Sequence, residues 1–248
     1  MHAVVIHEFG GPQVLRPGSF PDPTDRAGWV TVDLKASALN WHDVLVRQGR
    51  YRSPLPHVIG ADGAGVRRDT GEPVLIVPSL NWGARDEAPG PGWEILGDHI
   101  PGTYAELVSV PTECLAPKPA GFGWAQAAAL PLVGLTTYRA LFTRGRLRAG
   151  ESMLVVGAGG GIATMAVQLA SRAGAAISVT SSSPDKIAQA RGEGAGGGVL
   201  HTDPDWPEQA RQMSPSGGGF DLVLDPVGRW PESVRALRPG GRLVVLGA

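Results

Sequence analysis

The sequence predicts an α/β protein in which an irregular β-barrel domain, residues 1–118, precedes a doubly wound parallel sheet, residues 119–248. Three observations support this prediction. The first part contains short strand-like runs between turns rich in Pro and Gly. The second part alternates strand-like and helix-like segments, which is typical of parallel sheets. A length of 248 residues with 42% hydrophobic residues suffices for two globular domains.

In the first domain we expect one helix among the strands. The helix is predicted over residues 41–48, because Asn40 stands at a capping position and Gly49 follows the last turn. Residues 116–121 are rich in Pro and are interpreted as a linker. The lone cysteine, Cys114, precludes an intramolecular disulfide and is interpreted as a packing residue. The strands are expected at residues 3–6, 29–34, 74–77 and 104–110.

The second domain is expected to begin with helical segments and to continue as alternating strands and helices. Apolar runs of four to eight residues predict buried strands, and apolar residues at helical spacing predict the helices between them. The helices are expected at residues 124–130, 135–143, 165–173 and 185–191. The strands are expected at residues 153–156, 175–180, 198–200, 220–225 and 241–247.

A glycine-rich turn joins the strand at residues 153–156 to its helix. Gly157, Gly160 and Ala163 form a GxxGxxA pattern. Glycines permit a tight turn and a close approach of the backbone, and the free N–H groups at the helix start favour a pyrophosphate. A turn that merely connects the two elements is the alternative. The residues expected to contact a nicotinamide dinucleotide are Gly157, Gly159, Gly160, Gly161 and Ile162.

The strand count has a consequence for the end of the chain. A dinucleotide-binding sheet of this type has six strands, and the sequence supplies five. We therefore expect that the C-terminal part of the sheet is truncated and that the sequence is a fragment of a longer enzyme. Pairing of the apolar edge at residues 243–246 with a second copy, or poor folding, are the alternatives.

Composition and charge exclude several classes of partner. A net charge of −1 and the lack of a Lys/Arg block leave no electrostatic footprint for nucleic acid or an anionic membrane, so neither partner is expected. The apolar stretches are shorter than a membrane span, and the first residues lack the pattern of a signal peptide. A cytoplasmic protein is expected.

Several ordered motifs along the chain resemble those of the medium-chain dehydrogenase/reductase superfamily, and within it the quinone-oxidoreductase-like branch. They lie at residues 38–43, 57–66, 102–106 and 127–138, ahead of the glycine turn. The resemblance implies a GroES-like catalytic domain followed by a Rossmann domain, with a small-molecule substrate bound in the cleft between them. It also implies a homo-oligomer, either a dimer or a tetramer.

The resemblance further predicts an enzyme without zinc. Zinc members carry a catalytic Cys where this chain has Asn40, a His-Glu pair at Ala61-Asp62, and a second Cys near residues 133–134. Residues 79–87 occupy the place of the four-cysteine structural zinc lobe and contain no Cys. Zinc needs three protein ligands, which Asp62 alone does not supply. His42 and His99 remain as isolated histidines, for which surface or hydrogen-bonding roles are favoured over metal binding.

The end of the second strand of the parallel sheet favours NADP (NADPH) over NAD. No acidic residue stands at its tip to accept the ribose hydroxyls, and hydroxyls with a nearby ammonium suit a 2′-phosphate. The serines are also good helix caps, and both roles are compatible. Asp185 would favour NAD if the strand ended later than expected. The residues expected to select the cofactor are Ser181, Ser182, Ser183 and Lys186.

Without zinc, the acceptors expected are quinones and α,β-unsaturated carbonyl compounds, because their electrons are already drawn toward a conjugated carbonyl. By resemblance, Asn40, Tyr51 and Thr136 lie near substrate and nicotinamide and orient the acceptor. His42 is a candidate proton donor. Each of three residues has an alternative role: Asn40 as a helix cap, His42 as a structural residue and Tyr51 as a packing residue. A non-catalytic NADP(H)-binding or redox-sensing protein is the second hypothesis for function, and a zinc alcohol dehydrogenase the third.

Overall fold

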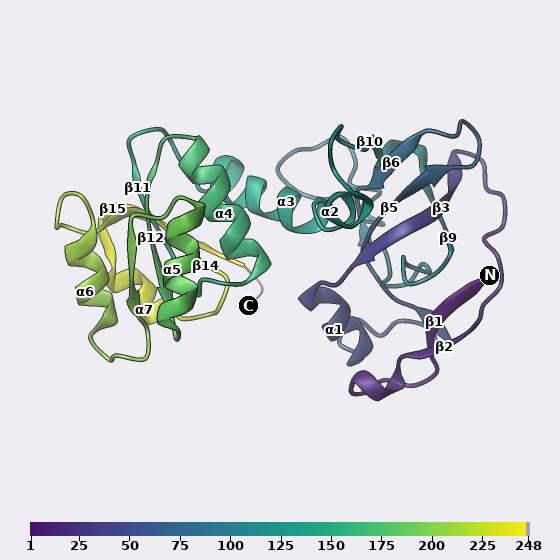
Figure 1. The fold of residues 1–248 in the computed structure, drawn as a ribbon, viewed down its shortest axis with the longest axis horizontal. Helices are drawn as coiled ribbons and strands as arrows, with labels where there is room; N and C mark the ends of the chain where they lie inside the picture. Colours follow the sequence, from purple (N-terminus) through teal and green to yellow (C-terminus); the bar gives the residue numbers. More distant parts are fainter. Residues whose placement is uncertain (247–248) are drawn as a thin grey trace. The chain divides into compact units, whose positions relative to one another are not determined.

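A computed structural model describes residues 1–246, and the chain divides into two compact units (Figure 1). Unit 1 comprises residues 1–132 and unit 2 residues 133–248. Unit 1 is built from antiparallel strands, whereas unit 2 contains one parallel sheet flanked by helices. This order of architectures confirms the predicted fold class. The domain boundary expected between residues 118 and 119 stays a prediction.

Unit 1 contains a three-stranded, a five-stranded and a two-stranded sheet, ordered β2-β1-β4, β10-β6-β5-β3-β9 and β7-β8. The long strand β3 is central because it pairs with both β5 and β9. Buried side chains such as Val32, Ile76 and Val110 form a core beside it. The strands are β1 (His2–Ile6), β2 (Arg16–Ser19), β3 (Trp29–Ala38), β4 (His57–Val58), β5 (Asp62–Arg67), β6 (Pro73–Ile76), β7 (Ser79–Leu80), β8 (Glu94–Ile95), β9 (Leu107–Pro111) and β10 (Leu115–Pro117).

Two helices complete unit 1. Helix α1 (Trp41–Arg47) begins after its N-cap Asn40, and Gly49, with a φ of +81°, follows its end in the left-handed conformation that favours glycine. Helix α2 (Trp124–Ala128) packs on β3 and β5. Short 3-10 turns lie at Pro12–Val14 and Thr112–Cys114, and Cys114 is buried.

Unit 2 contains a five-stranded parallel sheet with the order β13-β12-β11-β14-β15. Met153 and Val155 of β11 face a core that includes Ala166 of α4, while Leu154 faces a second core that includes Trp206 of α6. Because both faces of the strand are covered, its sequence is apolar without alternation. The strands are β11 (Ser152–Val155), β12 (Ala176–Ser181), β13 (Gly197–Leu200), β14 (Phe220–Asp225) and β15 (Leu237–Val245). Helix α3 (Pro131–Tyr138) starts with the last two residues of unit 1 and continues into unit 2. It is followed by a π-helical segment (Arg139–Arg144), α4 (Gly161–Arg172), α5 (Pro184–Glu193), α6 (Trp206–Met213) and α7 (Trp230–Arg235).

Three element predictions were wrong or incomplete. The expected linker at residues 116–121 begins inside β10, because Ala116 and Pro117 pair with β6 at the edge of a sheet, where a Pro is tolerated. The helix expected at residues 135–143 begins earlier, at Pro131. The elements that were not anticipated are strands β2, β4, β5, β7, β8 and β10 and helices α6 and α7. Of the strand expected at residues 241–247, Gly247 lies outside the described residues.

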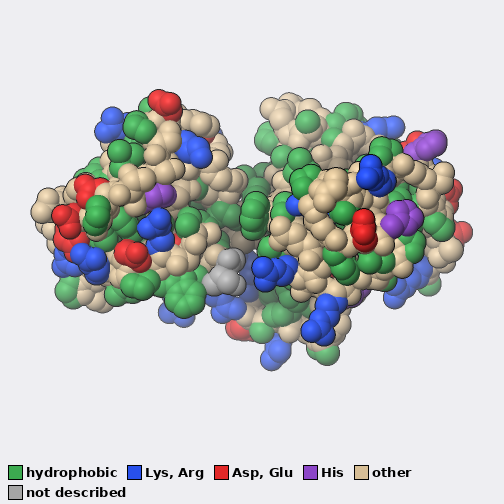
Figure 2. All heavy atoms as spheres, turned by 90° about the horizontal axis from the view of Figure 1, so that it is seen from below, with side chains coloured by type: hydrophobic (Ala, Val, Ile, Leu, Met, Phe, Trp, Pro, Cys, Tyr) green, Lys and Arg blue, Asp and Glu red, His purple; other side chains and the backbone are tan. Residues whose placement is uncertain are grey.

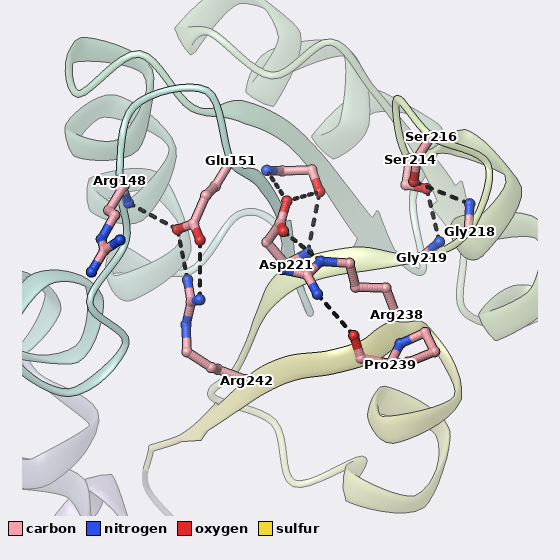
Figure 3. A network of polar contacts seen from close by, with 11 residues as sticks. Arg148, Glu151, Ser214, Ser216, Gly218, Gly219, Asp221, Arg238, Pro239 and Arg242 are labelled. Atoms are coloured by element: carbon pink, nitrogen blue, oxygen red, sulfur yellow. Dashed lines mark hydrogen bonds and ion pairs between the residues drawn. The ribbon is translucent and has the colours of Figure 1, made fainter.

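Carboxylates fix the amino-terminal edge of the parallel sheet (Figure 3). Asp221 accepts hydrogen bonds from the N–H and hydroxyl of Ser152, both at 2.8 Å, and from Arg238 Nε at 2.6 Å. Although burial opposes it, these donors lower the pKa of Asp221 to about 2. Glu151 pairs with Arg242 at 2.6 Å. This edge is therefore occupied by internal ion pairs, and the opposite, carboxyl edge holds the glycine turn.

Candidate functional site

The glycine turn lies between the end of β11 and the start of α4. Gly157 and Gly159 have φ values of +84° and +97°, a region that L side chains rarely adopt. A Cβ on Gly157 would stand 2.5 Å from Val227 Cγ2, so this turn also needs the small residue for space. Gly160 is the N-cap of α4 at a φ of −89°, and a Cβ there would meet no atom within 4 Å.

The amides of this turn divide into two groups. The N–H of Gly157 donates to Thr180 Oγ1 at 3.1 Å, and the N–H of Ala158 donates to the Thr180 carbonyl at 2.6 Å. Gly159, Gly160 and Gly161 are exposed, and Ile162 is half-buried. The first N–H groups of a helix have no intrahelical acceptor. The geometry therefore fits an anionic dinucleotide on the amides from Gly159 onward, while Gly157 contributes the shape of the turn.

The end of β12 presents the residues expected to select the cofactor. Ser181 is 1% exposed, and its Oγ accepts the N–H of Ser183 at 3.2 Å, so its hydroxyl oxygen serves the turn. Ser183 is the N-cap of α5, Ser182 is exposed, and Asp185 lies in the first turn of that helix. The Lys186 side chain passes over Gly159, because a Cβ there would meet its Cδ at 2.8 Å.

A buried acid that the sequence reasoning missed stands at the carboxyl end of β14. Asp225 accepts the N–H groups of Val227 and Gly228, each at 2.9 Å, and the hydroxyl of Ser233 at 2.9 Å. It thereby holds the loop whose Val227 side chain faces Gly157. The sequence signal was present, since an Asp followed by Pro, Val and Gly ends an apolar strand.

In unit 1, Asn40 links two buried carboxylates. Its backbone N–H donates to Asp43 Oδ2 at 2.8 Å, and its Nδ2 donates to Asp62 Oδ2 at 3.0 Å. Asp43 also accepts the Ala61 N–H at 3.1 Å and the Tyr104 hydroxyl at 3.0 Å. The Asn40 side chain also takes part in the capping box at the start of α1, where it faces the backbone N–H of Asp43. The hydrogen bond to Asp62 uses one N–H of the Asn40 amide, so the second N–H is left for another partner.

Burial dominates the electrostatics of this pair. Asp62 is 1% exposed, and burial raises its pKa to about 7, although the Asn40 amide and the Leu132 N–H oppose the shift. Burial also raises the pKa of Asp43. The two oxygens of Asp62 already accept hydrogen bonds from Asn40 and, at 2.9 Å, from the Leu132 N–H. Among residues 1–246, no group of three or more His, Cys, Asp or Glu side chains is arranged to hold a metal ion, so the donor set does not fit zinc.

A His–Asp pair lies at the start of the same helix. His42 Nε2 is 2.6 Å from Asp98 Oδ1, and the side chain of Asp98 is 8% exposed. The ring of Tyr51 lies against the His42 ring with centroids 4.7 Å apart. Burial and the Asp98 carboxylate raise the pKa of Tyr51, which keeps its hydroxyl protonated. Asp98 is 56 positions from His42, so no local sequence signal could have paired them.

The structure therefore brings together some of the predicted site residues. His42 and Tyr51 are in contact, and Asn40 begins the helix that carries His42. Thr136 belongs to unit 2, half-buried on α3. On the face drawn in Figure 2, acidic and basic side chains are interspersed over unit 2. Within residues 1–246, no helix is both long enough and apolar enough to span a membrane.

Known protein families match both parts of the chain. Residues 26–120 match the alcohol dehydrogenase GroES-like domain, and residues 161–248 match the family described as zinc-binding dehydrogenase. The chain is 32% identical to a quinone oxidoreductase of Pseudomonas aeruginosa over 248 residues, which cover 96% of this chain and 71% of that protein.

Two further proteins extend the comparison. A chloroplastic NADPH-dependent alkenal/one oxidoreductase of Arabidopsis thaliana is 32% identical over 254 residues, covering 99% of this chain and 62% of that protein. Among solved structures, an NAD-dependent alcohol dehydrogenase superposes with a TM-score of 0.93 and 38% identity, over 99% of this chain and 77% of that one. The chain therefore spans between 62% and 77% of the length of these two proteins.

Proposed function

The chain belongs to the medium-chain dehydrogenase/reductase superfamily, and we propose that it is an NADPH-dependent reductase of quinones or α,β-unsaturated carbonyl compounds that works without zinc. The observation that carries the proposal is the hydrogen-bonded state of Asp62 and Asn40, at positions where zinc members carry metal ligands. Both Asp62 oxygens accept N–H groups, and the second N–H of the Asn40 amide can donate to a substrate oxygen in place of a Lewis acid.

The cofactor part of the proposal is supported by the glycine turn and the end of β12. The amides of the exposed residues 159–161 suit the pyrophosphate, and the exposed Ser182 and Lys186 suit a 2′-phosphate. The acid nearest the tip of β12, Asp185, lies within α5 and not at the strand end where an NAD-selective acid stands. The chain resembles both an NADPH-dependent relative and an NAD-dependent dehydrogenase structure, and the titration described below distinguishes the two cofactors.

A bound nicotinamide supplies the hydride, and the chain's own residues handle the charge that forms on the acceptor. The free N–H of the Asn40 amide would donate to the carbonyl oxygen as it becomes negative, and Tyr51 would orient the acceptor. His42, held through Nε2 by Asp98, would donate the proton from its other ring nitrogen. Thr136, half-buried on α3 in unit 2, would contact the nicotinamide.

A titration and a turnover assay test the proposal. Quenching of the chain's Trp fluorescence is measured with NADPH and, separately, with NADH, and oxidation of the tighter-binding cofactor is then followed with a quinone and with an enone. Tighter NADPH binding with turnover supports the proposal. Binding without turnover of either acceptor supports a non-catalytic cofactor-binding protein instead, and no binding of either cofactor contradicts both.

A further inference from the structure

The side chains of Thr180 and His201 and the backbone amide of Gly157 meet at the glycine turn of unit 2. Thr180 on β12 is fully buried, and its Oγ1 lies 3.1 Å from the Gly157 nitrogen and 3.1 Å from His201 Nδ1. His201 follows the last residue of β13, and its backbone N–H donates to the Ser181 carbonyl at 3.0 Å. The backbone of His201 is thereby anchored to the strand that carries Thr180.

The numbers of donors and acceptors around Thr180 Oγ1 determine the direction of its hydrogen bonds to Gly157 and His201. The Gly157 N–H is a donor, so Thr180 Oγ1 accepts from it. A hydroxyl carries one proton, and a buried hydroxyl needs an acceptor for it. Among the described residues, His201 Nδ1 is the acceptor within reach of the Thr180 hydroxyl. Donation by the Thr180 hydroxyl to Nδ1 requires the neutral tautomer of His201, with its proton on Nε2.

We propose that His201 is a positioning residue of the dinucleotide site: by accepting the Thr180 O–H, it turns a lone pair of that hydroxyl toward the Gly157 N–H and so holds the first residue of the glycine turn. Its effect on cofactor affinity rests on the proposed function, whereas its effect on the turn does not. Partial burial and the nearby Arg229 lower the pKa of His201, in agreement with a neutral ring.

The hydrogen bonds from Thr180 matter because the glycines of the turn have no side chains that could hold their backbone in place. Gly157 has no side chain to pack, and its positive φ is one of many conformations open to glycine. The Thr180 hydroxyl and carbonyl together bind two successive amides, of Gly157 and Ala158. These bonds set the direction in which the following amides of residues 159–161 face. A loosened turn would have to be ordered again on binding, at a cost in affinity.

The first test uses the cofactor-free chain. The ¹⁵N chemical shifts of the histidine rings are recorded at pH 7.5, with His201 assigned by its loss in His201→Ala. The expected signature is a single neutral Nε2–H tautomer. Hydrogen exchange at Gly157 is then compared among variants, and we expect Thr180→Val and His201→Ala to accelerate it at least about tenfold. Thr180→Ser and His201→Asn, which retain a hydroxyl and an acceptor at the same place, should exchange like the unaltered chain.

The second test measures NADPH affinity of the same variants. Thr180→Val and His201→Ala are expected to weaken binding about tenfold, equivalent to about 1.4 kcal/mol, and the double variant no further. An Nδ1–H tautomer, an unchanged exchange rate at Gly157, or fully additive losses would each overturn the proposal. Accelerated exchange with no NADPH binding by any variant or by the unaltered chain would uphold the positioning role and contradict the proposed function.

Discussion

At the scale of single residues, burial decides the chemistry of the unit 1 site. Asp62 and Asp43 are both acids, and the sequence around them gives no sign that their pKa values are unusual. In the structure their exposed fractions are 1% and 3%, and the cost of a buried charge raises the pKa of each. Asn40 lies between them and donates to both. A residue that could have been only a helix cap is therefore also the link between two acids.

The pKa of Asp62 predicts how stability changes with pH. In the unfolded chain this carboxyl titrates near 3.8, and in the fold at about 7, so the folded state binds the proton more tightly. Its contribution to the free energy of unfolding is full below the lower value and is lost as pH rises through the higher one. The loss amounts to at most about 4 kcal/mol.

Asp62→Asn cannot ionise, so the unaltered chain should lose stability relative to this variant between pH 5 and pH 8. Urea unfolding at both pH values measures the difference. Asp69→Asn is the matched control, because the Arg67 guanidinium lowers the pKa of Asp69 and keeps it ionised throughout this range. Parallel pH dependence of the Asp62→Asn variant and the unaltered chain would rule out this titration.

The pairing of His42 with Asp98 predicts a coupled loss of turnover. Asp98→Asn keeps the size of the side chain but removes the charge that holds the imidazole, and His42→Gln removes the proton donor. Each is expected to lower kcat with a quinone about 10- to 100-fold and to leave NADPH binding unchanged.

The double variant separates a coupled pair from two independent residues. If His42 and Asp98 act as one unit, the double variant loses no more than the worse single variant. Glu94→Gln is the matched control. Glu94, on β8, pairs at 3.6 Å with the exposed His99, which follows Asp98 in the chain. A kcat loss in the Glu94→Gln variant as large as that of Asp98→Asn would show that the loop is merely sensitive to charge.

At the scale of elements, the sequence predicted the glycine turn but not the residues of other elements that hold it. The pattern of glycines after an apolar strand predicts a turn into a helix, and the structure has that turn. Thr180, His201 and Val227, which hold or contact it, come from β12 and from the segments after β13 and β14. The parallel order of the strands brings their carboxyl ends to one edge, and only that order places these residues together.

Two glycines of this turn predict opposite outcomes for the same substitution. Gly157→Ala meets Val227 at 2.5 Å and a φ of +84°, so the free energy of unfolding should fall by about 1–3 kcal/mol and NADPH binding should weaken. Gly160→Ala meets nothing within 4 Å at an ordinary φ, so stability should stay within about 0.5 kcal/mol. Thermal unfolding of both variants measures the contrast, and equal losses would refute it.

At the scale of the whole molecule, each unit has its own core and its own polar site. Unit 1 keeps the lobe at residues 79–95 folded through the pairing of β7 with β8 and a T-shaped contact between Trp82 and Trp93, whose ring centroids are 5.8 Å apart. Trp93 Nε1 also donates to Ser79 Oγ at 2.8 Å. The lobe therefore has an internal hydrophobic and hydrogen-bonded framework where the superfamily's zinc members use four cysteines.

This framework predicts that metal removal leaves the protein intact. Dialysis against EDTA should leave both the free energy of unfolding and the NADPH affinity unchanged. Among residues 1–246, no three His, Cys, Asp or Glu side chains are grouped so that they could hold a metal ion. Elemental analysis before and after dialysis provides the control for metal content. Stoichiometric zinc in the purified chain, together with a loss of stability on its removal, would contradict the zinc-free proposal.

The sequence by itself determined the elements whose signals are local. Apolar runs placed the strands of the parallel sheet, Asn40 and Gly49 placed the ends of α1, and the glycines placed the turn before α4. These features depend on backbone conformation and on neighbours a few residues apart, so periodicity and capping suffice to find them. The order of an antiparallel domain before a doubly wound sheet followed from the same signals.

The tertiary structure alone decided which distant polar groups meet and how burial changes them. Asp98 reaches His42, Asp62 reaches Asn40, and His201 reaches Thr180 across strand order and loop paths that no spacing in the chain encodes. Their ionisation and tautomers depend on the removal of water around them, which is a property of packing. The chain's local pattern thus specifies the scaffold, and the fold specifies the chemistry of the site.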